Sequence, residues 1–557
     1  MIHSKKVVIF GAGIAGLTAA HEFSKRGYKV TIYEANSESG GFFRSARKEE
    51  NKNSPSEYSW HGLGPFYHNV FSLFKEIPFD SKKNLYEAIL SRPIDFGLAS
   101  TKGTIRFDEP KSKPINVRKL FSFTIIDYFF WSWIMLKVWC SNRRSRLQYS
   151  RMNAKNTWMP FLSSKGIQNW SSCFGPWIGS DYFNVSVHQV GKFFLNQLIT
   201  KEKYEHKSDE EGPSWTHTAR SGWLLLNGPS NEVLFDKWVS HLKNQGVVFF
   251  WNQKLSELHY QNNLISQATL ESSEVIEADI FVLAINPFSA SQIIKKTPAL
   301  LNDKQLRKFP KLIEDGPHTQ VSFRLAFKEK INWNRNRCGL IIVDSAFNLT
   351  LFAQEQAWTK NINLGDEIKS LWTITACVSK TPGSVHGLPL EKCTKDQFID
   401  EVIFQLNQCE SLNELIKTSN NGKNFKEFEI SHIEVWDEWI FDPKGIKAIQ
   451  PKWVNSTNTQ KHIPTQKTGI ANLVLAGAHT QTSIDVWSIE AAVESGKRAV
   501  KIFENDVELK IQYEPGLLKI VRKFDDFLYF FKLPQIIDCS LILVILVLFY
   551  VVFSYIC

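Results

Sequence analysis

The chain of 557 residues is 43% hydrophobic and 22% charged, which excludes an intrinsically disordered protein and is long enough for about two or three domains. Its formal net charge of +10 comes from scattered Lys and Arg with acidic residues between them. No nucleic-acid-binding motif accompanies these charges, so we expect no nucleic-acid partner. The eight cysteines form neither a C-x-x-C pair nor a cluster with histidines at zinc spacing, so we expect no metal and a reducing compartment.

The amino end predicts a strand, a glycine-rich turn and a helix. Residues 6–10 are apolar and β-branched, and Gly11, Gly13 and Gly16 follow with the spacing G-x-G-x-x-G. The first glycine permits a tight turn, the second lets a pyrophosphate approach the backbone, and the third lets the helix pack closely on the sheet. The N-terminus of this helix, which runs to about Arg26, faces the phosphate charge.

A second strand and a second glycine turn extend the pattern. Residues 28–33 predict a strand that ends at Glu34, where a carboxylate accepts hydrogen bonds from a ribose. Gly40 and Gly41 permit a turn over a bound nucleotide, and Arg44 is placed to pair with a phosphate. Together these features predict a dinucleotide site. The alternative is a flavodoxin-like turn in which the glycines are accidental.

The stretch from Lys6 to Ser45 resembles the amino end of the flavin amine oxidase superfamily, which includes amine oxidases, protoporphyrinogen oxidases and carotenoid desaturases. The second glycine turn separates FAD binders from NAD dehydrogenases, so the resemblance implies FAD as the cofactor. The superfamily usually has a basic residue closer to the glycine pair, whereas Phe42 and Phe43 precede Arg44 here.

Residues 60–69 resemble the loop that lines the flavin in carotenoid-desaturase-like members. The resemblance implies that Gly62 and Leu63 contact the cofactor. His61 and Tyr67 either face the substrate, as weak catalytic candidates, or only form part of the wall around the cofactor.

Residues 76–215 are predicted to form a helical insertion on the substrate side. Within it, residues 121–140 are long and apolar enough for a hydropathy scan to indicate a membrane span. Asp127 and Lys137 inside this stretch favour instead a helix that lines an apolar cavity or dips into one leaflet.

Residues 223–252 return to the pattern of the superfamily. A helix is predicted over residues 234–245 and a strand over residues 247–251. Residues 278–284 resemble the matching strand of the nucleotide domain, and the resemblance places the backbone near Leu255 at the adenine.

Residues 320–327 and 371–378 predict strands of a mixed sheet beneath the substrate. Amine oxidases of the superfamily carry a flavin-side lysine in the region that corresponds to residues 320–333. This chain has Ser322 or Phe323 at that place, which counts against amine oxidation.

The last motif, residues 472–477, predicts a strand that is followed by a helix beginning at Ser488. It resembles the carboxyl-terminal FAD motif of the superfamily, in which the helix N-terminus points at the flavin and stabilises negative charge on the reduced ring. The superfamily usually has an acidic residue directly after Gly477. This chain has Ala478, with His479 as the expected substitute.

Residues 536–557 are apolar, with Asp538 as the one charge, and are long enough to span a bilayer. The alternative is a buried core helix or strand. Basic residues between 519 and 532 then place the body of the protein in the cytoplasm by the positive-inside rule. Residues 506–535 carry apolar side chains at intervals of three and four, which is typical of a helix that lies in the membrane interface or packs on the globular body.

We therefore expect an α/β fold with a Rossmann-like FAD-binding domain built from three segments, a mixed α+β substrate domain and a C-terminal transmembrane helix. The expected function is FAD-dependent desaturation or dehydrogenation of a small apolar, isoprenoid or lipid-like substrate at a membrane. The alternatives are a flavin-containing amine oxidase and a non-catalytic flavin-binding membrane protein. The expected segments are 1–75, 216–300 and 441–505 for FAD, 76–215 and 301–440 for the substrate, 506–535 as an amphipathic linker and 536–557 as a membrane tail. The predicted cofactor-binding residues are Gly11, Ala12, Gly13, Ile14, Ala15, Gly16, Glu34, Ala35, Gly41, Arg44, Gly62, Leu63, Leu255, Gly477, Ser488 and Ile489.

Overall fold

The computed structural model describes residues 5–539, except for 58, 60, 108–114, 159, 180–183, 208–213, 220, 315, 317–319, 334–336, 359–360, 378–379, 437–438 and 443–444. Most of the predicted membrane tail, from residue 540 onward, lies outside this part of the chain. Within the described residues, no helix combines the length and the apolar character that crossing a bilayer requires.

A five-stranded parallel sheet forms the nucleotide side of the molecule, in the order β21-β13-β1-β2-β9. Strands far apart in the sequence are neighbours in this sheet, and their carboxyl ends meet at one edge. In sheets of this kind a ligand binds outside that edge. The strands are β1 (Lys6–Phe10), β2 (Lys29–Tyr33), β9 (Val248–Phe250), β13 (Ile280–Leu283) and β21 (Leu473–Leu475).

Two helices from opposite ends of the sequence, α1 (Ile14–Ser24) and α16 (Ile489–Lys501), pack against each other beside this sheet. A Cβ atom on Gly496 would lie 2.6 Å from the carbonyl oxygen of Ala15, so the close approach requires glycine. The other elements of this side are the antiparallel sheet β10 (Leu255–Gln261), β11 (Leu264–Leu270) and β12 (Val275–Ile276), and the helices α2 (His68–Glu76), α3 (Leu85–Ala88), α10 (Asp236–Asn244), α11 (Pro287–Lys296) and α12 (Phe309–Leu312).

A seven-stranded mixed sheet forms the substrate side, in the order β18-β14-β17-β16-β15-β5-β6. Every residue of β14 and β17 is buried, so both faces of these central strands are covered. The predicted strands over 320–327 and 371–378 correspond to them. The elements are β5 (Phe96–Ala99), β6 (Arg106–Phe107), β14 (Gln320–Phe327), β15 (Gly339–Ile342), β16 (Thr350–Ala353), β17 (Ser370–Cys377) and β18 (Ile430–Val435), with α13 (Gln354–Ala357), α14 (Lys395–Gln408) and α15 (Glu410–Ser419).

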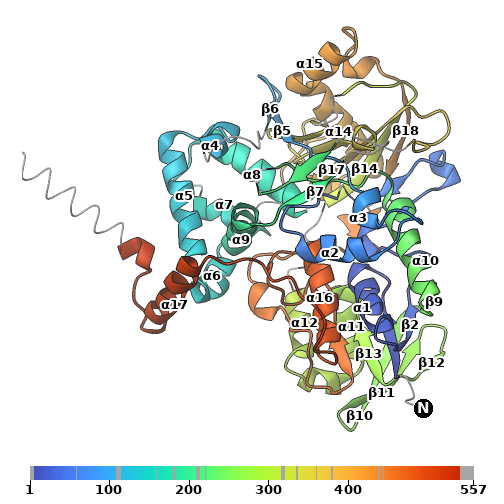
Figure 1. Ribbon diagram of the computed structural model, residues 1–557. Helices are drawn as coiled ribbons and strands as arrows, with labels where there is room; N and C mark the ends of the chain where they lie inside the picture. Colours follow the sequence, from blue (N-terminus) through green and yellow to red (C-terminus); the bar gives the residue numbers. More distant parts are fainter. Residues whose placement is uncertain are drawn as a thin grey trace, which may run out of the picture.

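Between residues 108 and 200 the described chain is helical, and these helices lie together at one side of the two sheets (Figure 1). The expected insertion also contains strands, because β5 and β6 join the substrate sheet. The helices are α4 (Ile115–Leu120), α5 (Ile125–Trp139), α6 (Arg143–Leu147), α7 (Ala154–Trp158), α8 (Ser164–Ile178) and α9 (Val187–Ile199). Elsewhere the chain forms α17 (Gly516–Phe530) and three short strand pairs, which are β3 (Ser45–Ala46) with β4 (Ser56–Glu57), β7 (Tyr204–His206) with β8 (Trp215–His217), and β19 (Trp439–Asp442) with β20 (Gly445–Ala448).

The apolar stretch 121–140 contains α5, whose two charged residues have structural partners. Thr124 and Asp127 form a capping box that closes the helix N-terminus, and the carboxylate of Asp127 also accepts a hydrogen bond of 2.6 Å from the backbone N–H of Ser163. The ammonium of Lys137 lies 2.9 Å from the carboxylate of Asp538. Asp127 therefore stabilises the start of a helix of 15 residues, which is about three quarters of the length that a bilayer span requires.

A buried polar chain joins the helical insertion to the loop that precedes α16. The carboxylate of Asp485 contacts the Nε2 atom of His188 at 3.0 Å, the guanidinium of Arg146 at 3.3 Å and the side-chain amide of Gln460 at 2.6 Å. The other ring nitrogen of His188 lies 2.6 Å from the hydroxyl oxygen of Ser145. His188 is 0% exposed and Asp485 is 7% exposed, so these hydrogen-bonded side chains stabilise the junction and do not bind a ligand.

Replacing Asp485 by Asn is expected to remove the acid sensitivity of this junction. Burial alone would raise the pKa of Asp485, but His188 and Arg146 hold it well below its usual range. A folded-state pKa below the unfolded value of about 3.9 stabilises the protein above about pH 4, and this stabilisation is lost as the pH falls further. We expect Asp485→Asn to lower the free energy of unfolding by about 3 kcal/mol at pH 7. Urea unfolding at several pH values measures this. An equal loss at pH 3 and pH 7 would contradict it.

Candidate active site

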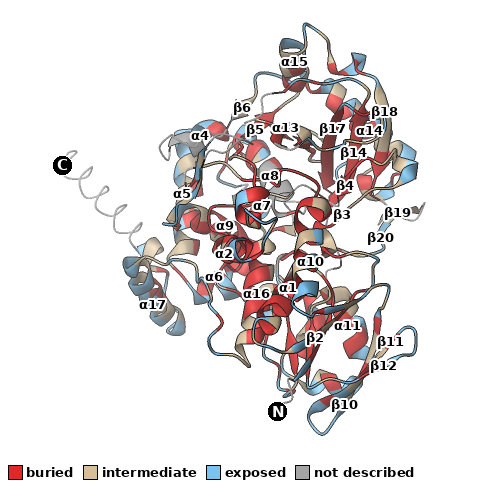
Figure 2. Ribbon diagram, turned by 45° about the vertical axis from the view of Figure 1, so that its right-hand side comes forward, coloured by how far each residue is buried: buried red, intermediate tan, exposed pale blue. Residues whose placement is uncertain are grey.

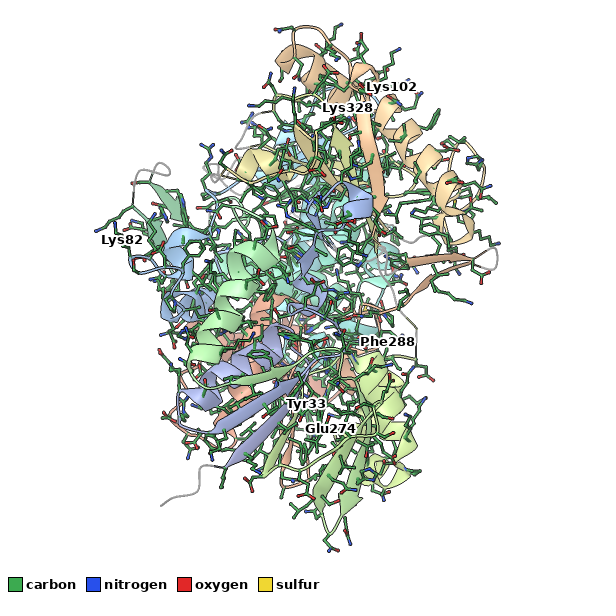
Figure 3. All side chains as sticks on the ribbon, turned by 90° about the vertical axis from the view of Figure 1, so that its right-hand side faces the viewer. Tyr33, Lys82, Lys102, Glu274, Phe288 and Lys328 are labelled. Atoms are coloured by element: carbon green, nitrogen blue, oxygen red, sulfur yellow. The ribbon has the colours of Figure 1, made fainter. Side chains whose placement is uncertain are left out.

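A cavity of about 600 Å³ lies at the carboxyl edge of the parallel sheet. Figure 3 shows two of its lining residues, Tyr33 and Phe288, in the lower half of the molecule. The lining also includes Phe10, Gly11, Gly13, Ile14, Ala15, Glu34, Ala35, Asn36, Gly40, Gly41, Phe43, Ser59, His61, Gly62, Phe66, Tyr67, Gly179, Phe193, Trp223, Lys254, Leu255, Glu271, Lys296, Gln320, Gln450, Lys452, Gly477, Ala478, His479, Trp487, Ser488 and Ile489.

The first glycine turn has the geometry of a phosphate cradle. Gly11 has φ +105°, and a Cβ atom there would lie 2.6 Å from the carbonyl oxygen of Ala284. A Cβ atom on Gly16 would lie 2.0 Å from the carbonyl oxygen of Gly11, so α1 packs on the turn only with glycine at this position. At Gly13, by contrast, the nearest atom is the Cα of Gly41 at 3.9 Å, because the space beside Gly13 belongs to the cavity.

Helix α1 begins directly at this cradle. Gly13 is its N-cap residue and supplies no side chain to the first N–H groups of the helix. Unpaired N–H groups and the positive end of the helix dipole favour an anion at this point. Ala12 is buried behind the turn, and Ile14 and Ala15 line the cavity. The arrangement fits the pyrophosphate of a dinucleotide.

The carboxylate of Glu34 lies beside the cradle and is 6% exposed. One of its oxygens accepts a hydrogen bond of 2.6 Å from the backbone N–H of Ala12, and the other accepts bonds from the backbone and side chain of Asn36 at 2.9 and 2.7 Å. A carboxylate has about four acceptor positions, so one remains for a ribose hydroxyl. Ala35 lines the cavity next to it.

Arg44 occupies a different place from the one that the phosphate hypothesis requires. Its guanidinium donates a hydrogen bond of 2.8 Å to the carbonyl oxygen of Gly41, lies 3.5 Å from the Glu38 carboxylate and 5.5 Å from the centre of the Trp436 ring. Arg44 is 4% exposed and is absent from the cavity lining. Because Phe42 and Phe43 separate it from the glycine pair, Arg44 stabilises the turn from behind.

The remaining predicted cofactor residues come from four separate segments. Gly62, Leu255 and Ile489 line the cavity, whereas Leu63 is fully buried outside it and donates its backbone N–H to the carbonyl oxygen of Leu224 at 2.8 Å. Ser488 lines the cavity and caps α16, since its hydroxyl oxygen accepts a hydrogen bond of 3.2 Å from the N–H of Ala491.

The segment after β21 supplies no charge to the cavity. Gly477 has φ +146°, and the ring of His479 fills the space that its Cβ atom would occupy, at 2.3 Å. Burial lowers the pKa of His479 to about 3, so this ring is neutral near pH 7. His479 therefore does not replace the negative charge that the superfamily carries at the position of Ala478.

His61 and Tyr67 both lie in the cavity wall. Burial, together with the charges of Lys452 and Arg324, holds the pKa of His61 well below its usual range, and burial beside Glu490 raises the pKa of Tyr67. Both side chains are therefore uncharged near pH 7. The Nε2 atom of His61 is buried and has no hydrogen-bond partner among the described residues, so it can pair with a ligand atom or an ordered water in the cavity.

Lys452 is a charged residue of the cavity wall that sequence reasoning missed. It is 6% exposed, lines the cavity, and places its ammonium 4.9 Å from the centre of the Trp487 ring. Burial lowers the pKa of Lys452 to about 8, so it remains a cation near neutral pH. A lysine between Pro451 and Trp453 matches no general motif, and only the fold brings it to the site.

The strand at which amine oxidases carry their lysine has no lysine facing the cavity among its described residues. Ser322 and Phe323 are buried in β14 and do not line the cavity, whereas Gln320 does and donates a hydrogen bond of 2.6 Å to the Ser59 hydroxyl oxygen. Lys328 pairs with Glu429 at 2.5 Å and lies far above the cavity in Figure 3.

Two family models match the chain. A model of NAD(P)-binding Rossmann-like domains matches residues 9–77, and a model of flavin containing amine oxidoreductases matches residues 226–502. The chain belongs to the flavin amine oxidase superfamily. Its cofactor is FAD, and its members are oxidoreductases of the amine oxidase and desaturase type. The open space at Gly13, the uncapped start of α1 and the Glu34 carboxylate fit this cofactor.

Solved structures share the fold over most of the chain. An oxidoreductase from Methanosarcina mazei has a TM-score of 0.60 at 14% identity, covering 90% of this chain and 100% of that one. A putative protoporphyrinogen oxidase from Exiguobacterium sp. 255-15 has a TM-score of 0.55 at 14% identity, covering 91% and 100%. Cyclohexylamine oxidase from Brevibacterium oxydans has a TM-score of 0.54 at 15% identity, covering 90% and 99%.

Curated proteins match the chain over short stretches. Carotenoid phi-ring synthase from Chlorobaculum tepidum is 28% identical over 114 residues, which is 20% of this chain and 17% of that protein. An L-amino-acid oxidase from Siganus canaliculatus is 53% identical over 47 residues, which is 8% of this chain and 9% of that protein. The chain thus spans less than a fifth of the length of these curated relatives.

Proposed function

We propose that the protein oxidises an apolar substrate that carries no basic amine, in a dehydrogenase or desaturase reaction. A hydride and a proton leave the substrate, a double bond forms, and the electron pair passes finally to oxygen or a quinone. Bound FAD supplies the two-electron acceptance in this reaction. This chain positions the cofactor at Gly13 and Glu34 and excludes water from the reacting part of the substrate.

The observation that carries the proposal is the charge of the cavity wall. Among the described lining residues the carboxylates are Glu34 and Glu271, and both lie at the nucleotide end: Glu34 next to the glycine turn, and Glu271 paired with Lys254 at 2.7 Å. Another part of the cavity is lined by aromatic residues, namely Phe66, Tyr67, Phe193, Trp223 and Trp487. The cation among the described residues of this part is Lys452. A protonated amine entering there would meet a like charge in an apolar surrounding, which is unfavourable.

The aromatic side chains of the cavity wall and its polar side chains then have separate roles in binding the substrate. The aromatic side chains exclude water and contact the apolar part of the substrate. The buried Nε2 atom of His61 and the Lys452 ammonium are positioned to hold an electron-rich oxygen at its polar end. The apolar substrate expected from the sequence agrees with this wall, and an isoprenoid or lipid-like molecule is the substrate class we propose.

Replacing Lys452 by Met is expected to change the preference of the cavity for charged probes. The FAD-loaded protein should bind 3-phenylpropionate about tenfold more tightly than 3-phenylpropylamine, and Lys452→Met should remove this preference. Because the pKa of Lys452 is about 8, binding of the carboxylate should weaken as the pH rises through that value, and the variant should not show this dependence. Quenching of tryptophan fluorescence measures the affinity for each probe and its dependence on pH. Tighter binding of the amine would contradict the assignment.

The reaction itself is tested by anaerobic mixing of the FAD-loaded protein with isoprenoid and acyl-lipid probes and with a matched panel of amines. The proposal expects loss of oxidised-flavin absorbance with an apolar probe and a product that lacks two hydrogen atoms. Loss of oxidised-flavin absorbance with the amines alone, followed by peroxide release when air is admitted, would favour an amine oxidase. Reversible reduction by dithionite without reaction of any probe would leave a non-catalytic flavoprotein as the better account.

A further inference from the structure

Helix α17 is amphipathic, but its orientation is the reverse of the usual one in a water-soluble protein. Its large apolar side chains recur at helical intervals and point away from the body. Leu517 is 74% exposed, Ile520 66%, Phe524 49%, Phe527 55% and Phe530 70%. A helix of a globular domain normally turns such a stripe inward.

Two charged residues of α17, Arg522 and Asp525, face the protein instead. Arg522 is 5% exposed and donates a hydrogen bond of 2.7 Å to the carbonyl oxygen of Trp139. Asp525 is 0% exposed and pairs with Arg144 at 3.2 Å. These buried polar contacts fix the rotation of the helix about its axis, so the outward direction of the apolar stripe is specified by the sequence.

Helix α5 adds a second apolar stripe at the same side. Ile125 is 74% exposed, Ile126 65%, Phe129 50% and Leu136 43%. Figures 1 and 2 both show α5 and α17 at the same edge of the molecule, and Figure 2 shows much of α17 in the colour of exposed residues. The hydrogen bond of 2.5 Å from Gln535 to the carbonyl oxygen of Lys137 joins the two regions.

We propose that the exposed faces of α5 and α17 form a surface that rests in the headgroup region of an anionic lipid bilayer. Isolated exposed apolar residues are common, but two aligned stripes of this size mark an interaction site. We call this surface the α5–α17 face. The proposed contact of this face with a bilayer goes beyond the proposed reaction and does not depend on it.

Charge and the course of the chain favour a bilayer as the occupant. Lys519, Lys523 and Lys532 are exposed beside the stripe of α17, where they would meet anionic headgroups. In a contact between two copies of this chain, these lysines would approach each other. The sequence that follows Cys539, the last described residue, contains no Asp, Glu, Lys or Arg, so the rest of the chain is an apolar segment. Apolar burial and lipid charge act together in interfacial helices of this kind.

Depth-dependent fluorescence in the full-length protein tests the α5–α17 face separately from the apolar segment. A fluorescent unnatural amino acid would be incorporated singly at position 126, at position 524, and at position 275 as the control. Val275 is 51% exposed and lies on β12, far from both helices in Figure 1. The probe surface is a vesicle of about one part phosphatidylserine to four parts phosphatidylcholine with brominated acyl chains.

We expect the bromine atoms to quench the labels at positions 126 and 524, while the label at position 275 stays unquenched. Phe524→Glu combined with Phe527→Glu should reduce the quenching at position 126 at least about fivefold. Both side chains are exposed, so an unchanged thermal midpoint shows that the variant remains folded.

Unquenched labels at both positions in protein that sediments with the vesicles would overturn the proposal, because the apolar segment alone would then hold the protein. Quenching of only one of the two labels would also overturn a shared surface. A dimer in lipid-free solution that covers position 524 and persists on vesicles would assign the face to a second copy of the chain instead.

Discussion

A Gly13→Val variant is expected to fold normally and to lose its flavin. The Cβ atom of residue 13 would have no protein atom closer than 3.9 Å, and its backbone φ of −76° suits any residue, so the apoprotein should keep its stability. The added side chain would project into the cavity at the point where α1 begins. We expect FAD affinity to fall about 100-fold or more, which corresponds to about 2.8 kcal/mol.

The matched control is Gly16→Val. A Cβ atom at residue 16 would lie 2.0 Å from the carbonyl oxygen of Gly11, so this variant should lose both stability and flavin. Isothermal titration with FAD and thermal unfolding of the apoproteins separate the two effects. Wild-type FAD affinity in Gly13→Val would show that the pyrophosphate does not bind at this turn.

The second large effect is expected at the buried cation of the substrate-side sheet. Arg324 is 2% exposed and donates hydrogen bonds to the side chains of Gln354 and Thr373. Its guanidinium lies 3.4 Å from the Glu57 carboxylate, which is 5% exposed, and Glu434 lies next to the pair along β18. Replacing Arg324 by Met leaves two buried carboxylates without their cation. We expect the free energy of unfolding to fall by about 3–5 kcal/mol.

The pH dependence of this loss identifies its cause. Burial raises the pKa of Glu57 and raises that of Glu434 to about 7, while Arg324 opposes both shifts. Without Arg324 the folded-state pKa values rise further above the unfolded ones, so protonation in the folded state relieves the loss as the pH falls. The destabilisation should be smaller at about pH 5 than at about pH 8 in urea unfolding. The double variant with Glu57→Gln should recover at least about 1 kcal/mol at pH 8. A loss that is the same at both pH values would contradict an electrostatic origin.

Local sequence patterns were sufficient to predict the dinucleotide site and the Rossmann-like part of the fold, and the family resemblance then implied FAD. A β-branched strand, glycines at fixed spacing and an acid after the next strand describe one continuous βαβ unit, so every constraint lies within a few residues of its neighbours. The structure accordingly brings Gly13, Glu34 and Gly41 to one cavity, together with Gly477 from the far end of the chain. The membrane tail stays a prediction, since residues 540–557 lie beyond the described part.

The errors and omissions have a different physical origin. Arg44 was expected to pair with a phosphate because it follows the glycine pair, but the sequence does not show that the two intervening phenylalanines leave its guanidinium against the carbonyl oxygen of Gly41. Lys452 was missed because its position depends on packing between distant segments. Helix α5 was expected to line an apolar cavity or to dip into a leaflet. Its described residues are absent from the cavity lining, which argues against the first alternative, and its apolar stripe lies on the surface, so the second alternative stays a prediction. Periodicity showed that α17 has two faces but not which one meets the protein, because that depends on buried partners such as Arg144.

The most direct test of this account is the flavin content of the purified full-length protein. We predict the absorbance spectrum of an oxidised flavin, an equimolar amount of FAD released on denaturation, and reversible loss of the absorbance on reduction. Protein that carries no flavin after purification, and whose thermal midpoint does not rise when FAD is added, would contradict the assignment of the cavity and the enzymatic function that rests on it.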